Sequence, residues 1–163
     1  MTSSSMNLFG ERAERPSFPR FSIKLVKESK VFYSQKKISN AKMVCELVMC
    51  LGLHEKASEE FHAIYLTTKH EVIGIEMISR GTLNATLTHP REVFKGALLA
   101  NAHAIILAHN HPSGNLEPSV PDKHVTETLV QAGKILDIKV LDHVIVGTAG
   151  GFYSFMESGQ LSA

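Results

Sequence analysis

Residues 105–122, IILAHNHPSGNLEPSVPD, combine an apolar run, a pair of histidines and a loop rich in proline and glycine. The run from Ile105 to Ala108 predicts a buried strand that ends at His109 and His111. Because residues two apart in a strand point to the same side, both imidazoles are expected to face one point. The proline, serine and glycine at 112–114 then end the strand.

A second pair of polar residues, Ser119 and Asp122, stands at the start of the longest predicted helix, which runs to about Leu136. In one interpretation Ser119 is the N-cap and Asp122 serves the helix N-terminus from the first turn. In the other, Asp122 joins His109 and His111 as a metal ligand. Two imidazoles and one carboxylate leave a fourth tetrahedral position for water, as in catalytic rather than structural zinc sites. The interpretations are compatible, because Ser119 can cap the helix and still reach the site.

The spacing His-x-His, seven residues, Ser-x-x-Asp resembles the JAMM motif of the MPN-domain metalloproteases. The sequence of residues 109–122 is similar to that of the RadC-like branch. Further short motifs that resemble this branch lie at 81–84, 89–92 and 141–147. The resemblance covers about residues 55–157. It implies an α/β fold with a mixed, curved β-sheet flanked by helices, a cytidine-deaminase-like or MPN-type sandwich. It also implies a Zn2+ ion on His109, His111 and Asp122, and hydrolysis of peptide or isopeptide bonds.

The resemblance further implies a general base at the start of the first hairpin strand, where Glu59 and Glu60 stand. The apolar spacing up to Leu66 favours Glu59, with Glu60 as the alternative. A carboxylate there would take a proton from a metal-activated water and pass it to the leaving amine. The family gives Ser119 an oxyanion role, in which its hydroxyl donates to the tetrahedral intermediate.

Other polar residues have plainer interpretations. Glu76 lies within a strand and is a weaker candidate base, and Glu117 is expected to face solvent. Asn110 should point away from the two histidines and brace the loop. His143 is expected to form hydrogen bonds inside the sheet, with a role beside the metal ligands as the alternative. Arg91 fits a surface ion pair better than a substrate-binding role.

The remaining pattern alternates helices with strands. A helix capped by Ser39 or Asn40 is predicted to run to about Leu51, and another begins at Pro90. The inward faces of the predicted helices include Leu98 and Leu136. Strands are predicted at 21–27, 61–66, 72–78, 82–88, 103–109, 140–146 and 152–155. Hairpins as well as crossovers connect these strands, which predicts a mixed sheet.

Length and composition are those of an ordinary soluble protein, with 163 residues, 44% hydrophobic and 20% charged. We predict a flexible basic arm at residues 1–20 and one domain at 21–163. Residues 1–40 hold eight Lys/Arg against three Asp/Glu, or +5, and the remainder nine against thirteen, or −4. This asymmetry permits nucleic-acid contact through the arm, but a solvated tail is the simpler explanation.

The sequence predicts a cytoplasmic protein without a membrane anchor. Residues 1–7 are polar, unlike a signal peptide, and no apolar run approaches the length of a membrane span. Cys45 and Cys50 are five apart in a predicted helix and do not share a face. We therefore expect two buried thiols without a disulfide.

Two other classes of function stay open. The first is an accessory protein of DNA repair or mobile elements that binds nucleic acid or protein and hydrolyses nothing. Longer members of the resembling family carry a helix–hairpin–helix segment that binds DNA, whereas here only the basic arm is expected to offer such contact. The second is a metal-dependent nuclease, which would need a groove richer in Lys and Arg than the surroundings of the motif.

Overall fold

One mixed sheet of five strands, in the order β2-β1-β3-β4-β5, forms the centre of the computed structural model, which describes residues 18–81 and 88–161. The strands are β1 (Glu60–Leu66), β2 (Val72–Arg80), β3 (Ala104–His111), β4 (Lys139–Gly147) and β5 (Phe152–Ser154). Strands β3 and β4 pair in parallel, whereas the other neighbours are antiparallel. The mixed sheet predicted from the hairpins and crossovers is confirmed.

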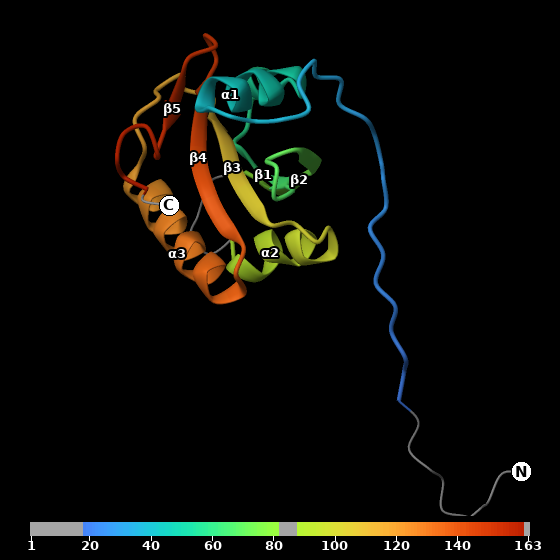
Figure 1. The fold of residues 1–163 in the computed structure, drawn as a ribbon. Helices are drawn as coiled ribbons and strands as arrows, with labels where there is room; N and C mark the ends of the chain where they lie inside the picture. The colour runs from blue at the N-terminus through green and yellow to red at the C-terminus, as the bar shows by residue number, and fades with distance from the viewer. Residues whose placement is uncertain (1–17, 82–87, 162–163) are drawn as a thin grey trace, which may run out of the picture.

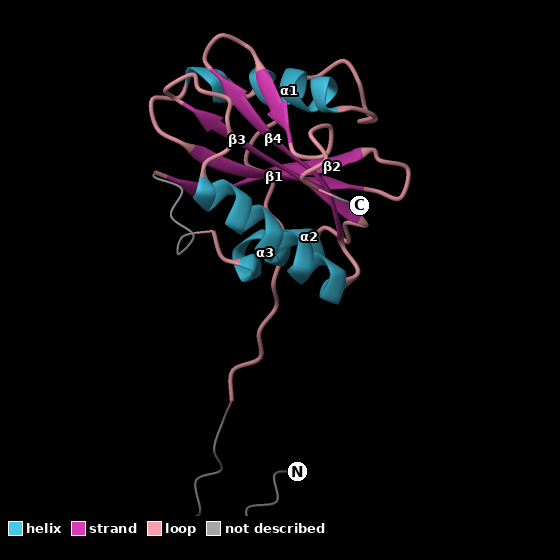
Figure 2. Ribbon diagram, turned by 90° about the vertical axis from the view of Figure 1, so that its left-hand side faces the viewer, coloured by secondary structure: helices cyan, strands magenta, loops and turns pink. Residues whose placement is uncertain are grey.

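Helices cover both faces of this sheet, so the fold has three layers. Helix α1 (Ala41–Cys50) and the short 3-10 turn η1 (Leu53–Glu55) lie on one face. Helices α2 (Pro90–Leu99) and α3 (Val120–Leu136) lie on the other, as Figures 1 and 2 show. The expected α/β sandwich is therefore confirmed. Within the two described ranges, no helix is long and apolar enough to cross a membrane.

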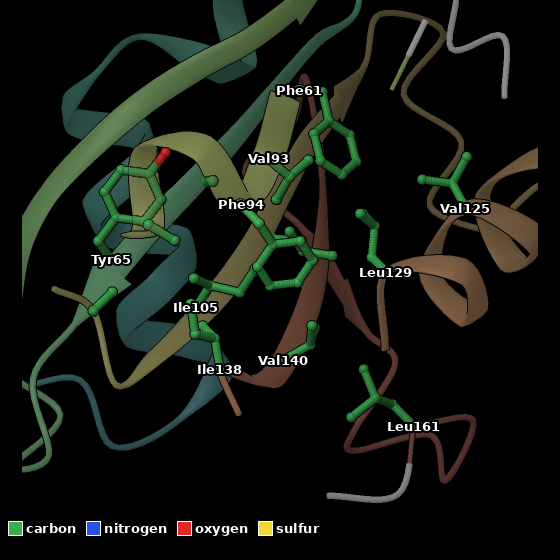
Figure 3. Close-up of a cluster of buried hydrophobic side chains, with 14 of the residues drawn as sticks. Phe61, Tyr65, Val93, Phe94, Ile105, Val125, Leu129, Ile138, Val140 and Leu161 are labelled. Carbon is green, nitrogen blue, oxygen red and sulfur yellow. The ribbon is translucent and has the colours of Figure 1, made fainter. Parts of the chain in front are cut away.

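The alternation of side chains along the strands divides the core into two clusters. The cluster towards α2 and α3 is shown in Figure 3 and includes Phe61, Tyr65, Phe94, Ile105 and Leu129. The cluster towards α1 includes Val48, Ile64, Leu66, Ile106 and Val144. Strand β3 lies between β1 and β4 and is covered on both faces, which explains why its sequence is a continuous apolar run.

Local sequence signals set the ends of the first two helices. The Asn40 side chain accepts a hydrogen bond from the Met43 amide at 2.9 Å and caps α1. Gly52 follows this helix with a φ of 68°, a left-handed conformation that favours glycine. Pro90 is the first residue of α2, where its missing N–H costs no hydrogen bond. The predicted starts of both helices are confirmed.

The predicted strand at 21–27 is wrong. Residues 18–33 form neither helix nor strand and run as an extended segment outside the layers (Figure 1). Phe21 and Ile23 are 82% and 73% exposed. An alternating pattern does not stabilise a strand without a neighbour to complete its hydrogen bonds. The first 17 residues of the predicted arm, and most of the strand expected at 82–88, lie outside the described residues.

Three side chains predicted to face inward are exposed: Cys50, Leu98 and Leu136. All three lie in the last turn of their helices. The inward stripe of α2 is formed by Val93, Phe94 and Ala97. Both cysteines are free, as predicted, but only Cys45 is buried.

Helix α3 packs closely against its surroundings at a glycine, Gly133. A Cβ on Gly133 would lie 2.5 Å from the backbone carbonyl oxygen of Ile138 and 3.3 Å from the Phe94 ring. The carbonyl belongs to the turn that leads into β4, so it cannot move aside as a flexible side chain could. The distance between α3 and the sheet therefore depends on the missing side chain.

We expect Gly133→Ala to destabilise the protein by about 1–3 kcal/mol, because the added methyl group overpacks this contact. Urea unfolding followed by circular dichroism measures the change. Gly74→Ala is the matched control, since nothing lies within 4 Å of its added Cβ, and it should be neutral or stabilising. An unchanged unfolding midpoint in Gly133→Ala would contradict the close approach.

Candidate metal centre

The carboxyl-terminal end of β3 brings two imidazoles to one point. His109 and His111 both belong to this strand, and their Nε2 atoms lie 3.0 Å apart. Both side chains are buried. Because β3 is hydrogen-bonded to a strand on either side, the backbone that carries His109 is held firmly.

The start of α3 brings a carboxylate to the same point. Asp122 Oδ2 accepts hydrogen bonds from the Ser119 amide at 2.7 Å and from the Ser119 hydroxyl at 2.6 Å. The Ser119 hydroxyl oxygen in turn accepts from the Asp122 amide, which completes a capping box and confirms the capping interpretation. The same carboxylate also faces the histidines, with Oδ1 3.4 Å from His109 Nε2 and Oδ2 3.4 Å from His111 Nε2.

The three side chains form a donor set that fits a small divalent cation. One ligand atom from each residue lies within 4.8 Å of those from the other two. Ligand atoms about 2.1 Å from a tetrahedral ion lie about 3.4 Å apart. The separations in the structure are 3.0 Å for the histidine pair and 3.4 Å from each histidine to the carboxylate. These residues could therefore hold a metal ion at three of the four positions of a tetrahedron.

Burial and charge set the protonation of the three groups. Burial lowers the pKa of His109 well below its ordinary value, and the nearby His143 adds to this shift. The Asp122 carboxylate raises the pKa of His111 against the opposing effect of burial. Burial raises the pKa of Asp122, but His111, His109 and Ser119 together outweigh it, so this pKa is lowered. A neutral imidazole beside an ionised carboxylate is a state that binds a metal ion.

A third histidine, His143 of β4, lies directly behind His109. Its Nε2 is 2.8 Å from His109 Nδ1, and its Nδ1 is 2.6 Å from the Thr126 hydroxyl oxygen. The ring stacks on Phe155 with 4.9 Å between centroids, and burial lowers its pKa to about 3. The predicted hydrogen bonding of His143 is confirmed. The sequence did not identify Thr126, which belongs to no recognisable motif.

Glu59 and Glu60 diverge at the start of β1. Glu60 is buried, with Arg80 Nη2 2.8 Å from Oε1 and His62 Nε2 3.2 Å from Oε2. Glu59 is the residue before β1, two positions from Phe61, whose ring stacks on His109. The charge of Glu59 is also one of the causes that raise the pKa of His111. The charge of Glu59 therefore acts on a residue of the donor set, whereas Glu60 is bound by Arg80 and His62.

Asn110 ties the end of β3 to the segment that leads into β1. Its Oδ1 accepts a hydrogen bond from the Glu60 amide at 2.8 Å. Its Nδ2 donates to the carbonyl oxygens of Lys56 and Ser58 at 3.3 and 3.2 Å. The side chain points away from the two histidines, as predicted. It holds the backbone on both sides of Glu59.

The other candidates lie outside the donor set. Glu76 accepts a hydrogen bond from the Tyr65 hydroxyl, and Glu117 is exposed. Arg91 forms an exposed ion pair at 3.5 Å with the neighbouring glutamate. Ser119 is exposed at the edge of the site, and its hydroxyl donates to Asp122. An oxyanion role for Ser119 would require this hydroxyl to exchange one acceptor for another.

The chain is similar in sequence to known proteins over much of its length. A family profile described as the RadC-like JAB domain matches residues 38–160. A UPF0758 protein of Symbiobacterium thermophilum is 56% identical over 104 residues, which cover 64% of this chain and 44% of that protein. A UPF0758 protein of Pelodictyon phaeoclathratiforme is 50% identical over 126 residues, covering 77% and 56%. The chain thus spans about half the length of the curated relatives it matches. By the extent of the profile match, the chain belongs to the RadC-like JAB-domain family.

Proposed function

We propose that this chain is a zinc-dependent metallohydrolase that cleaves amide bonds in peptides or isopeptides. The observation that carries the proposal is the convergence of His109, His111 and Asp122 within 4.8 Å, with the charge of Glu59 acting on His111. Two imidazoles and one carboxylate form the donor set of several zinc hydrolases. When bound, zinc lowers the pKa of a coordinated water to about 7 and so supplies a nucleophile.

The surrounding residues have separate roles in this proposal. Glu59 accepts the proton of the attacking water and passes it to the leaving amine, as a general base and then a general acid. Ser119 donates its hydroxyl to the oxyanion that develops on the substrate carbonyl. Its exposed position at the start of α3 supports this role, because substrate can reach it from solvent. Glu60 stays bound to Arg80 and His62 and takes no part.

The substrate in this proposal is a peptide or protein, and the site of action is the cytoplasm. A reducing compartment agrees with the free thiols of Cys45 and Cys50.

A second candidate function is nucleic-acid binding by the segment before the folded body. Arg20, Lys24, Lys27 and Lys30 lie on the extended, exposed residues 18–33, where Glu28 is the acidic residue. Phosphate contacts by these side chains would make binding strongly dependent on salt. A gel shift with duplex DNA that weakens as salt rises, and that charge reversal of these four residues abolishes, would support this function.

The first prediction of this proposed function concerns metal content. Purified wild type should hold about one zinc per chain, and the His109→Ala/His111→Ala double variant should hold none, because two of three ligands are lost. Elemental analysis measures both, and circular dichroism checks that the variant folds. His103→Ala is the matched control, since His103 is exposed just before the same strand, and it should retain zinc. Full zinc content in the double variant would exclude this metal site.

The second prediction separates the two glutamates. Glu59→Gln should keep zinc but lower kcat by about 10²–10⁴-fold on a peptide or isopeptide that the wild type cleaves, because the proton acceptor is lost. Glu60→Gln should lower the urea midpoint, since Glu60 is buried beside Arg80 and His62, yet keep kcat within a few-fold. The reverse pattern of kcat values would assign the base to Glu60. A zinc-loaded wild type that cleaves nothing in a broad panel would argue against hydrolysis.

The third prediction concerns the brace behind Glu59. Asn110→Asp keeps the acceptor for the Glu60 amide but loses both donors, and it should destabilise the protein by about 1–3 kcal/mol. Turnover should fall while zinc content stays unchanged, because the segment around Glu59 loosens. Urea unfolding, elemental analysis and a turnover assay measure the three quantities. Asn115→Asp is the control, since Asn115 is exposed and an aspartate there keeps the side-chain oxygen that accepts from the Glu117 amide.

A further inference from the structure

A chain of polar contacts runs from His109 into the first turns of α3. His109 Nδ1 is 2.8 Å from His143 Nε2, and His143 Nδ1 is 2.6 Å from the Thr126 hydroxyl oxygen. That oxygen is in turn 2.6 Å from the carbonyl oxygen of Asp122. The side chains of His109, His143 and Thr126 are buried. The series of contacts begins at His109 and ends at the Asp122 carbonyl, and both residues belong to the donor set.

The direction of these hydrogen bonds follows from the groups that can donate. The Asp122 carbonyl can only accept, and two oxygens at 2.6 Å would repel each other without a hydrogen between them, so the Thr126 hydroxyl donates to it. This hydroxyl has no second hydrogen, so His143 Nδ1–H donates to Thr126. The Nε2 of a neutral His143 then carries a lone pair, and His109 must donate to it from Nδ1.

We propose that Thr126 and His143 are positioning residues that fix His109 as its Nδ1–H tautomer and so aim the Nε2 lone pair at the metal. The inference rests on the proposed metal site and extends it to two residues that would not touch the ion. Ligating histidines generally depend on the group bonded to their second nitrogen for ring orientation and tautomer. Here that group is a neutral histidine, whose own tautomer is set by a threonine on another element.

A comparison with His111 shows why the tautomer of His109 needs a further group to fix it. His111 Nδ1 is 2.6 Å from the backbone carbonyl oxygen of Asn115, which can only accept, so the tautomer of His111 is set by the backbone. A histidine partner can either accept or donate. If these hydrogen bonds pointed the other way, His143 would donate to His109 Nδ1. His109 would then carry its hydrogen on Nε2, inside the donor set. The Thr126 hydroxyl excludes this arrangement.

We call the series of hydrogen bonds from Thr126 through His143 to His109 the relay. The affinity of the 163-residue chain for Zn2+ tests it. Competition with a chromophoric chelator should show that Thr126→Val binds Zn2+ about 10- to 100-fold more weakly than the wild type, because the hydroxyl that orients His143 is lost. Thr128→Val is the matched control. Thr128 donates the same kind of bond, to the His124 carbonyl at 2.8 Å, on the exposed side of the same helix, so its loss should leave affinity unchanged.

Replacement of His143 separates hydrogen bonding from packing. His143→Gln offers an oxygen to His109 and an N–H to Thr126, so zinc affinity should stay close to wild type. His143→Leu fills similar space without either group, and its affinity should fall at least as far as that of Thr126→Val. Urea unfolding of all variants corrects for any loss of folded protein. Equal affinities in the wild type and Thr126→Val would overturn the relay.

The tautomer itself is measured without metal. Long-range nitrogen–proton NMR correlations of the metal-free wild type, with labelled histidine, should show His109 and His143 as Nδ1–H tautomers. In Thr126→Val the His109 signals should shift towards the Nε2–H form, whereas in Thr128→Val they should not. An Nε2–H signal for His109 in the wild type would overturn the inference. A wild type with the expected tautomers that binds no zinc would instead refute the proposed function and leave the hydrogen-bond relay standing.

Discussion

The arrangement of the site depends on one buried charge, the carboxylate of Asp122, which is 1% exposed. An ionised group with so little solvent needs hydrogen bonds and opposite charge around it. The start of α3 supplies the first through the Ser119 amide and hydroxyl, and β3 supplies basic partners through His109 and His111. The helix cap and the candidate metal site therefore share one carboxylate. Loss of Asp122 would disturb the helix N-terminus and the donor set together.

The alternation of residues along β3 places the two candidate ligand histidines on one face of the sheet and the bracing side chain of Asn110 on the other. On the side of α2 and α3, the end of β3 carries His109 and His111, and the charge of Glu59, the residue before β1, acts on His111. On the other side, Asn110 binds the backbone around Glu59. A slip of one residue in either strand would exchange these faces. Pairing of β1 with β3, with Phe61 opposite His109, excludes such a slip.

The interior behind the donor set is polar but well satisfied. His143 has partners on both ring nitrogens and lies between Phe61 and Phe155, with ring centroids 5.3 and 4.9 Å away. Its pKa of about 3, lowered by burial, keeps it neutral at physiological pH. The neutral ring adds no charge to a site in which Asp122 already carries one. The surrounding aromatic rings also hold His143 in the orientation that its two hydrogen bonds require.

The sequence by itself determined the chemistry of the donor set and most of the sheet. His109 and His111 lie two apart in one strand, and Ser119 and Asp122 share one helical turn, so local geometry alone brings each pair together. The strand expected at 21–27 failed because an apolar alternation carries no information about a pairing partner. Only the tertiary structure placed Glu60 beside Arg80 and His62 and joined Thr126 and His143 to His109. Apart from the pair with His62, these contacts link residues 17 to 34 positions apart, and their geometry depends on how the strands pair and how α3 packs.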